Sequence, residues 1–144
     1  MNKLAVIILA AGKGTRMNSN LPKVLHKIDN KSMINHVIST AEKLNPNKII
    51  TVLGYKYDTV KSFLIDSNVE FAYQHKQLGT GHAIIQCTEL LMDFIGEVLI
   101  LSGDVPMIRF YTLSNLIAEH NKSNSEATVL TADFIESKGY GRVI

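Results

Sequence analysis

An unbroken apolar run near the N-terminus, Leu4 to Ala11, leads directly into two glycines and a group of cations. A run of this length without polar alternation is typical of a β-strand buried on both faces. Such strands lie at the centre of parallel sheets. The glycines leave backbone N–H groups open to an anion, and the nearby cations are Lys13, Arg16 and Lys23. The stretch therefore predicts a central strand followed by a phosphate-binding loop.

Two familiar nucleotide-binding loops also place glycines after a strand, and the spacing excludes both. A Walker-type loop ends in Gly-Lys followed by Ser or Thr, whereas Lys13 precedes Gly14 here. A dinucleotide-binding fingerprint needs a third glycine three residues after Gly14, where this chain has Met17. The loop therefore indicates a phosphate site of another kind.

The rest of the chain alternates helical and strand patterns. Apolar residues at helical spacing predict helices over residues 33–44, 57–64, 81–92 and 111–120, the first with Ser32 as its N-cap. Apolar runs predict further strands over residues 48–53, 69–73, 98–101 and 127–134. This alternation predicts an α/β fold: a Rossmann-like, mostly parallel sheet with helices on both faces and right-handed crossovers.

Composition limits the classes of function. A chain of 144 residues that is 46% apolar predicts one globular domain, and a formal charge of +2 is too small to favour nucleic acid. A small anionic ligand is expected instead. With Cys87 as the single cysteine, an internal disulfide is excluded and a reducing, cytoplasmic compartment is favoured. No stretch approaches transmembrane length, so membrane insertion is not expected.

A carboxylate follows the strand predicted over residues 98–101. Asp104 stands after Gly103 and two residues before Pro106. Mg²⁺ prefers carboxylate oxygen and usually keeps water and phosphate as its other ligands. Ligands of parallel α/β sheets bind at the carboxyl ends of the strands, so Asp104 and the loop around Gly14 are expected to meet. A turn-capping aspartate would show the same local pattern.

A third polar cluster follows the strand predicted over residues 69–73. Gln74 carries an amide donor and an amide acceptor, which together match the imide edge of uracil or thymine. Gly79 and Gly81 permit the close approach of a flat base. A glycine-rich helix start capped by Thr80 would explain the same residues without a ligand.

The histidines are weaker candidates. His26, His75 and His82 stand close to these clusters in sequence, but their spacing forms no metal-binding motif. His36 and His120 fall in or near predicted helices, where a surface or capping role is expected.

Four motifs occur in order along the chain. They are Leu9-Ala10-Ala11-Gly12-Lys13-Gly14-Thr15-Arg16-Met17 with Pro22-Lys23, then Gln77-Leu78-Gly79-Thr80-Gly81-His82-Ala83, Gly103-Asp104-Val105-Pro106 and Gly139-Tyr140-Gly141-Arg142. In this order they resemble the N-terminal pyrophosphorylase domain of the bacterial bifunctional enzymes that make UDP-N-acetylglucosamine.

The resemblance implies transfer of a uridylyl group from UTP to N-acetylglucosamine 1-phosphate, with release of pyrophosphate and a requirement for Mg²⁺. It implies catalytic roles for Arg16, Lys23 and Asp104, with Asp104 as the metal ligand. The implied sugar contact is Gly141, and the implied nucleotide contacts are Leu9, Ala10, Ala11, Gly12, Gly14, Lys23, Gln74, Gly79 and Thr80. Two alternatives stay open: a thymidylyl- or cytidylyltransferase, and a catalytically incomplete nucleotide-binding fragment.

The resemblance also bears on domain organisation. The family's catalytic domain is longer, so residues 1–144 are expected to hold only its N-terminal nucleotide-binding part. The sugar-binding part and the left-handed β-helix with acetyltransferase activity are expected to be absent. Full-length members are expected to be trimers through that β-helix, and this chain a monomer or dimer.

Overall fold

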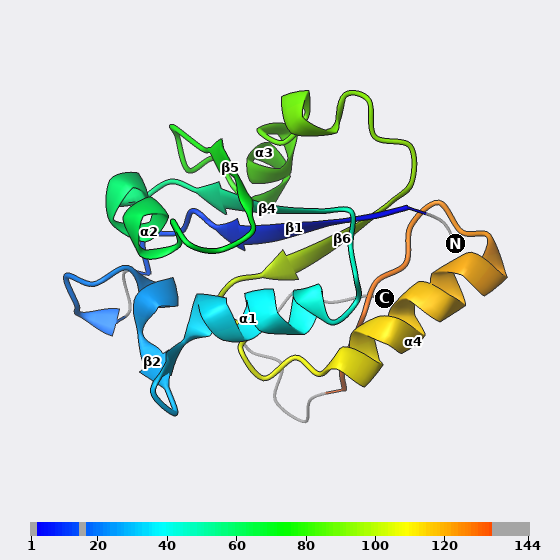
Figure 1. Ribbon diagram of the computed structural model, residues 1–144, viewed down its shortest axis with the longest axis horizontal. Coiled ribbons are helices and arrows are strands. Elements are labelled where there is room, and N and C mark those ends of the chain that lie inside the picture. The colour runs from blue at the N-terminus through cyan, green and yellow to red at the C-terminus, as the bar shows by residue number, and fades with distance from the viewer. Residues whose placement is uncertain (1–2, 15–16, 134–144) are drawn as a thin grey trace. The chain divides into compact units, whose positions relative to one another are not determined.

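The computed structural model describes residues 3–14 and 17–133 (Figure 1). The chain forms two compact units, Met1–Phe110 and Tyr111–Ile144. Helix α4 (Phe110–Ser123) begins with the last residue of the first unit and otherwise belongs to the second. The rest of the described part of the second unit is the irregular segment 124–133. None of the described helices combines the length and the apolarity needed to cross a bilayer.

The first unit is built on a parallel sheet, which the described residues order as β5-β4-β1-β6. Its strands are β1 (Leu4–Ala10), β4 (Lys48–Leu53), β5 (Glu70–Tyr73) and β6 (Glu97–Ser102). β1 lies between β4 and β6 and pairs in parallel with both (Figure 1). The central part of β1, including Ile7, is fully buried, as an unbroken apolar run requires. The predicted α/β fold is confirmed.

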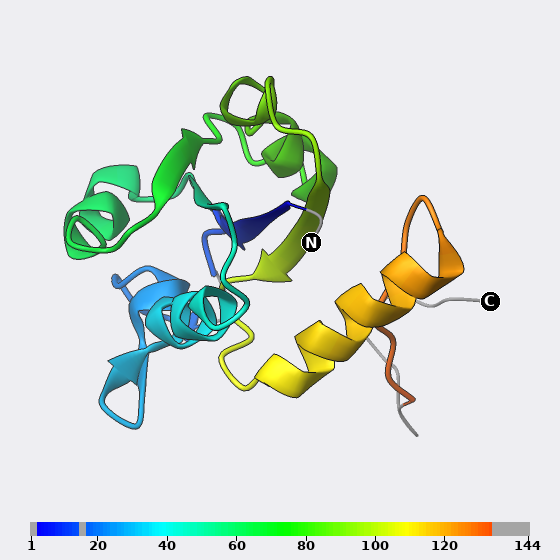
Figure 2. The ribbon, with the colours of Figure 1, turned by 45° about the vertical axis from the view of Figure 1, so that its right-hand side comes forward.

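Helices cover both faces of this sheet, as predicted. α1 (Met33–Glu42) lies on one face and α3 (Thr80–Ile85) on the other (Figure 2). On the α3 side, Ala83 belongs to one buried cluster with Ile7 and Ile50, which stand opposite each other in β1 and β4. The shorter helices of the first unit are α2 (Tyr57–Phe63), η2 (Lys23–Leu25) and η3 (Glu89–Leu91), the last two of 3₁₀ type.

The start of α1 has the predicted capping chemistry. Ser32 accepts a hydrogen bond from the backbone N–H of Asn35 at 3.3 Å, which satisfies one of the free donors of the first turn. At α3 the N-cap is Gly79, and no side chain caps the helix. Thr80 is therefore the first helical residue and not the cap.

Cys87 belongs to the buried cluster on the α3 side. Burial raises the pKa of its thiol to about 11. The thiol is therefore protonated at neutral pH, which suits a residue of the core and not a reactive site.

The helix predicted over residues 81–92 is wrong in its second half. α3 ends at Ile85, and a tighter turn leads to η3. The Thr88 hydroxyl donates to the Ile85 carbonyl at 2.7 Å, and the Thr88 backbone N–H contacts the same oxygen at 3.1 Å. A local hydroxyl bond of this kind competes with regular helical bonding, so the helix does not continue.

The strand predicted over residues 127–134 is also wrong across residues 127–133, and Phe134 lies outside the described residues. Val129 and Leu130 are exposed, and no strand pairing involves this segment in the described part of the chain. An apolar run becomes a strand only where a neighbour completes its backbone hydrogen bonds.

The sequence analysis did not predict a small hairpin between the first loop and α1. Strands β2 (Lys27–Ile28) and β3 (Lys31–Ser32) pair antiparallel around Asp29 and Asn30. These two residues have φ values of 52° and 64°, as in the tight two-residue turns that suit hairpins. The Asp-Asn pair was the available signal.

Candidate active site

The loops that follow the four strands of the sheet meet at one edge. Gly103, after β6, donates its backbone N–H to the Leu9 carbonyl at 2.9 Å. Tyr55, after β4, donates to the Ala11 carbonyl at 3.1 Å, and Gln74, after β5, donates to Leu53 at 2.8 Å. Backbone bonds thus join the carboxyl ends of neighbouring strands, where ligands of α/β sheets bind.

The loop after β1 requires glycine at Gly14. Its φ is +63°, and a Cβ on it would lie 2.7 Å from the Cβ of Lys23. Only glycine meets both conditions without strain. Gly12 differs, because a Cβ there would meet nothing within 4 Å, so its backbone faces open space. Arg16 lies outside the described residues.

An ion pair connects this loop to the loop after β6. Lys23 Nζ lies 2.6 Å from Asp104 Oδ2, and the two side chains are 34% and 36% exposed. Exposed pairs of this kind stabilise a fold only slightly, because water screens them. The pair instead brings together two charges that are 81 residues apart in sequence.

The chemistry of Asp104 fits a Mg²⁺ ion held mainly by a substrate. The described residues contain no group of three or more His, Cys, Asp or Glu side chains that could hold a metal ion by themselves. Mg²⁺ is commonly bound by one or two carboxylates together with phosphate oxygens and water. One accessible carboxylate beside a phosphate-type loop meets that description.

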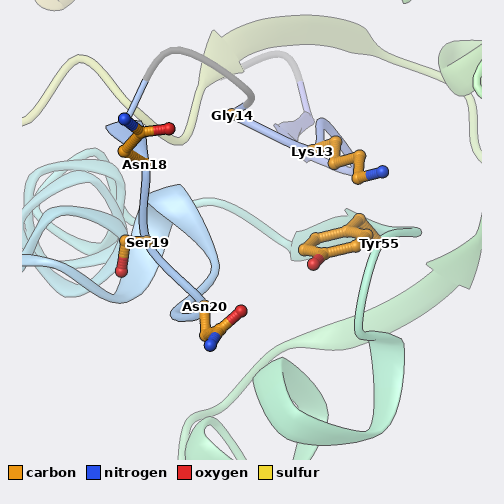
Figure 3. Close-up of a pocket in the computed structure, with 6 residues that line it drawn as sticks. All are labelled: Lys13, Gly14, Asn18, Ser19, Asn20 and Tyr55. Atoms are coloured by element: carbon orange, nitrogen blue, oxygen red, sulfur yellow. The ribbon is translucent and has the colours of Figure 1, made fainter.

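A pocket of about 330 Å³ lies beside the glycine loop (Figure 3). Its lining residues are Lys13, Gly14, Asn18, Ser19, Asn20 and Tyr55. The Tyr55 ring has two ammonium groups near it, Lys13 Nζ at 5.6 Å and Lys56 Nζ at 5.7 Å from the ring centroid. The cations and the polar lining favour an anionic occupant.

The third cluster is a hydrogen-bonded network around Gln74. Gln74 Nε2 lies 3.0 Å from the Gly79 carbonyl oxygen and 3.0 Å from His82 Nδ1. Gln77 Nε2 donates to the Gln74 carbonyl at 3.1 Å. Thr80 begins α3 directly after Gly79. The sequence analysis named His82 only among the weaker candidates, on its closeness in sequence to this cluster, and did not predict its contact with Gln74.

Two of the sequence-predicted site residues cannot be placed. Gly141 and Arg16 lie outside the described residues. Leu9, Ala10 and Ala11 form the end of β1 and the start of its loop, and both alanines are buried. The residues that the structure brings to one edge therefore come from all four strand ends.

A comparison with known proteins shows the family of the domain that carries this site. Residues 6–138 match the model of the MobA-like NTP transferase domain. The chain belongs to this family. The phosphate-type loop and the carboxylate after β6 are thus parts of an NTP transferase domain.

Similar curated relatives include two proteins named Bifunctional protein GlmU. That of Picosynechococcus is 49% identical over 141 residues, which cover 97% of this chain and 31% of the relative. That of Lactobacillus johnsonii is 49% identical over 144 residues, 100% of this chain and 31% of the relative. This NTP transferase domain thus resembles the GlmU N-terminal region and spans about a third of the relatives' length.

Solved structures share the fold. A nucleotidyl transferase from Methanothermobacter superposes with a TM-score of 0.71 at 20% identity, covering 83% of this chain and 58% of that one. A CMP-2-keto-3-deoxy-manno-octonic acid synthetase complexed with CTP gives 0.65 at 21% identity, covering 85% and 49%. A Mycobacterium tuberculosis protein complexed with manganese gives 0.62 at 15% identity, covering 84% and 60%. At these identities the likeness concerns the fold of the domain.

Replacing Lys23 with methionine is expected to raise the affinity of the nucleotide-free domain for Mn²⁺ about two- to fivefold, because Asp104 loses a competing cation in a partly exposed pair. Electron paramagnetic resonance of free Mn²⁺ measures this affinity. Lys13→Met is the matched control, since Lys13 lies over Tyr55 and makes no ion pair with Asp104 in the described structure. An equal rise in both variants would contradict direct competition at Asp104.

Proposed function

We propose that this chain is the nucleotide-binding part of a uridylyltransferase. The reaction transfers the uridylyl group of UTP to N-acetylglucosamine 1-phosphate, giving UDP-N-acetylglucosamine and pyrophosphate in the cytoplasm, for cell-envelope polysaccharide precursors. The observation that carries the proposal is the Lys23–Asp104 contact beside Gly14, in a chain 49% identical to bifunctional GlmU proteins.

In this reaction the protein contributes mainly by aligning the two substrates and by neutralising phosphate charge, and it needs to form no covalent bond to either. An oxygen of the sugar phosphate forms a bond to the α-phosphorus of UTP, and the bond from that phosphorus to the bridging oxygen of pyrophosphate breaks. The attacking phosphate is already an anion and needs no general base. Pyrophosphate leaves with the electron pair of the broken bond.

The cations of the loop after β1 face the leaving group in this proposal. Lys23 and Arg16 offset the growing charge on pyrophosphate, while backbone N–H groups at Gly12 and Gly14 hold the triphosphate. Asp104 would hold Mg²⁺, which supplies further neutralisation of phosphate charge when bound. Lys23 leaves Asp104 for the phosphates when the site fills.

The base and sugar contacts complete the proposal. Gln74, Gly79 and Thr80 surround the uracil, and Leu9, Ala10 and Ala11 line the nucleotide along the end of β1. Gly141 contacts the sugar. A monomer or dimer remains the expected oligomeric state.

The decisive assay mixes the chain with UTP, Mg²⁺ and N-acetylglucosamine 1-phosphate and follows pyrophosphate. We expect turnover with UTP and much slower turnover with CTP, dTTP or ATP. Preferential turnover of CTP would contradict the uridylyl proposal and favour a cytidylyltransferase. One of the solved structures with this fold is a synthetase complexed with CTP.

A second candidate is a nucleotide-binding piece without activity of its own, which the 31% coverage of the relatives favours. Its signature is UTP binding by calorimetry with no release of pyrophosphate. A chain that binds no nucleotide would contradict both candidates.

A further inference from the structure

The side-chain amide of Gln74 is held in one orientation by two acceptors. Gln74 is 3% exposed, and its Nε2 atom faces both the Gly79 carbonyl and His82 Nδ1 at 3.0 Å. A carbonyl oxygen only accepts hydrogen bonds, so the amide NH₂ must be the group that faces Gly79. Its second hydrogen is then directed to His82.

This arrangement assigns the proton on the His82 ring. Nδ1 must be the unprotonated nitrogen, so the neutral ring carries its hydrogen on Nε2. Gln86 Nε2 lies 3.4 Å from His82 Nε2, a long contact between two donors, and it donates instead to the His82 carbonyl at 3.0 Å. Toward Gln74, His82 acts only as an acceptor.

One polar atom of the Gln74 amide is then left for a ligand. Among the described residues no hydrogen bond reaches Gln74 Oε1. The fully buried side-chain atoms without a partner in that part of the chain are His26 Nε2 and Thr51 Oγ1, so Gln74 Oε1 keeps a small accessible area although the residue is 3% exposed. With both Nε2 contacts made within the chain, the Gln74 amide has an acceptor, and no donor, left to offer a ligand.

The backbone of the two glycines that follow Gln74 is not covered by other atoms. Gly79 has a φ of +102°, and a Cβ on it would meet nothing within 4 Å; the same space lies at Gly81. A base that approaches this backbone meets an amide acceptor and no amide donor from Gln74. Uracil carries a hydrogen on N3, whereas cytosine has a lone pair at the same position.

We propose that His82 is a specificity-determining positioning residue, which accepts from Gln74 Nε2 together with the Gly79 carbonyl and so helps to keep Oε1 toward N3–H of uracil. The lone pair of cytosine N3 would face the same oxygen without a hydrogen between them, and an unpaired contact of this kind is rejected strongly. The proposal rests on the proposed function, because it requires a pyrimidine nucleotide beside Gln74.

The test compares the dissociation constants of UTP and CTP, measured by calorimetry with Mg²⁺ on the whole chain. We expect the unaltered chain to prefer UTP, and His82→Leu to reduce the UTP-to-CTP preference about three- to tenfold, the worth of one neutral hydrogen bond. His82→Asn supplies an amide oxygen near the place of Nδ1 and should restore most of the preference. Ile85→Ala, an exposed change on the same helix, should leave it unaltered.

The outcomes separate this inference from the function on which it rests. A chain that prefers UTP equally well with His82→Leu would overturn the role of His82 and leave the uridylyl proposal standing. A chain that binds neither nucleotide, or prefers CTP, would overturn both. Nitrogen NMR of the neutral imidazole gives a check that needs no variant: a hydrogen on Nδ1 of His82 would overturn the inference.

Discussion

Asp104→Asn is expected to lower kcat about 10²-fold or more, while the affinity for UTP without metal changes little. Asparagine has nearly the same shape as aspartate but lacks its charge, so it binds Mg²⁺ much more weakly. Asp104 is partly exposed and pairs with Lys23, so the loss of its charge is not expected to disturb the core.

Two measurements check this expectation. Pyrophosphate release gives kcat, and calorimetry with UTP in the presence of a chelator gives the metal-free affinity. Asp66→Asn is the matched control, because Asp66 is exposed and follows α2. An unchanged kcat in Asp104→Asn would remove this carboxylate from the mechanism.

Gly96→Ala is expected to lower the free energy of unfolding by about 1–3 kcal/mol, as overpacking does. A Cβ on Gly96 would lie 2.3 Å from the Lys3 carbonyl oxygen and 2.9 Å from the Lys3 carbonyl carbon. Both are backbone atoms of the residue directly before β1, so they cannot turn aside as a flexible side chain can. The entry into β6 must shift relative to the central strand.

Urea denaturation followed by circular dichroism measures this loss. Gly81→Ala is a matched control, because a Cβ there meets nothing within 4 Å and Gly81 lies in the first turn of α3. Alanine is the better helix former by about 1 kcal/mol, so this variant should be as stable as the original or more so. Equal stability of Gly96→Ala would mean that the turn before β6 relaxes freely.

The features that could be predicted from the sequence are those that follow from the burial of strands and from the topology of a parallel sheet. The central place of β1 followed from an apolar run without polar interruption, because only a strand covered on both faces tolerates it. The contact between the first loop and Asp104 was expected from the rule that parallel strands end at one edge. These features follow from periodicity and topology, which a single sequence displays.

Features set by local competition or by distant partners could not be predicted. The break after Ile85 depends on where the Thr88 hydroxyl finds its acceptor, and the segment 127–133 depends on a neighbour that a sequence does not name. The role of His82 depends on which ring nitrogen meets Gln74, a matter of 3.0 Å contacts. Side-chain contacts of this kind produce no periodic pattern in the sequence, so they could not be predicted from it.

The backbone hydrogen bond from Gly103 to Leu9 has a consequence for how the site keeps its dimensions. The backbone separation between the start of the glycine loop and the loop that carries Asp104 is set by main-chain hydrogen bonding within the sheet, which a side-chain rotamer change does not alter. A substitution of a side chain at this edge is therefore expected to change what the site can contact without moving the two loop backbones apart.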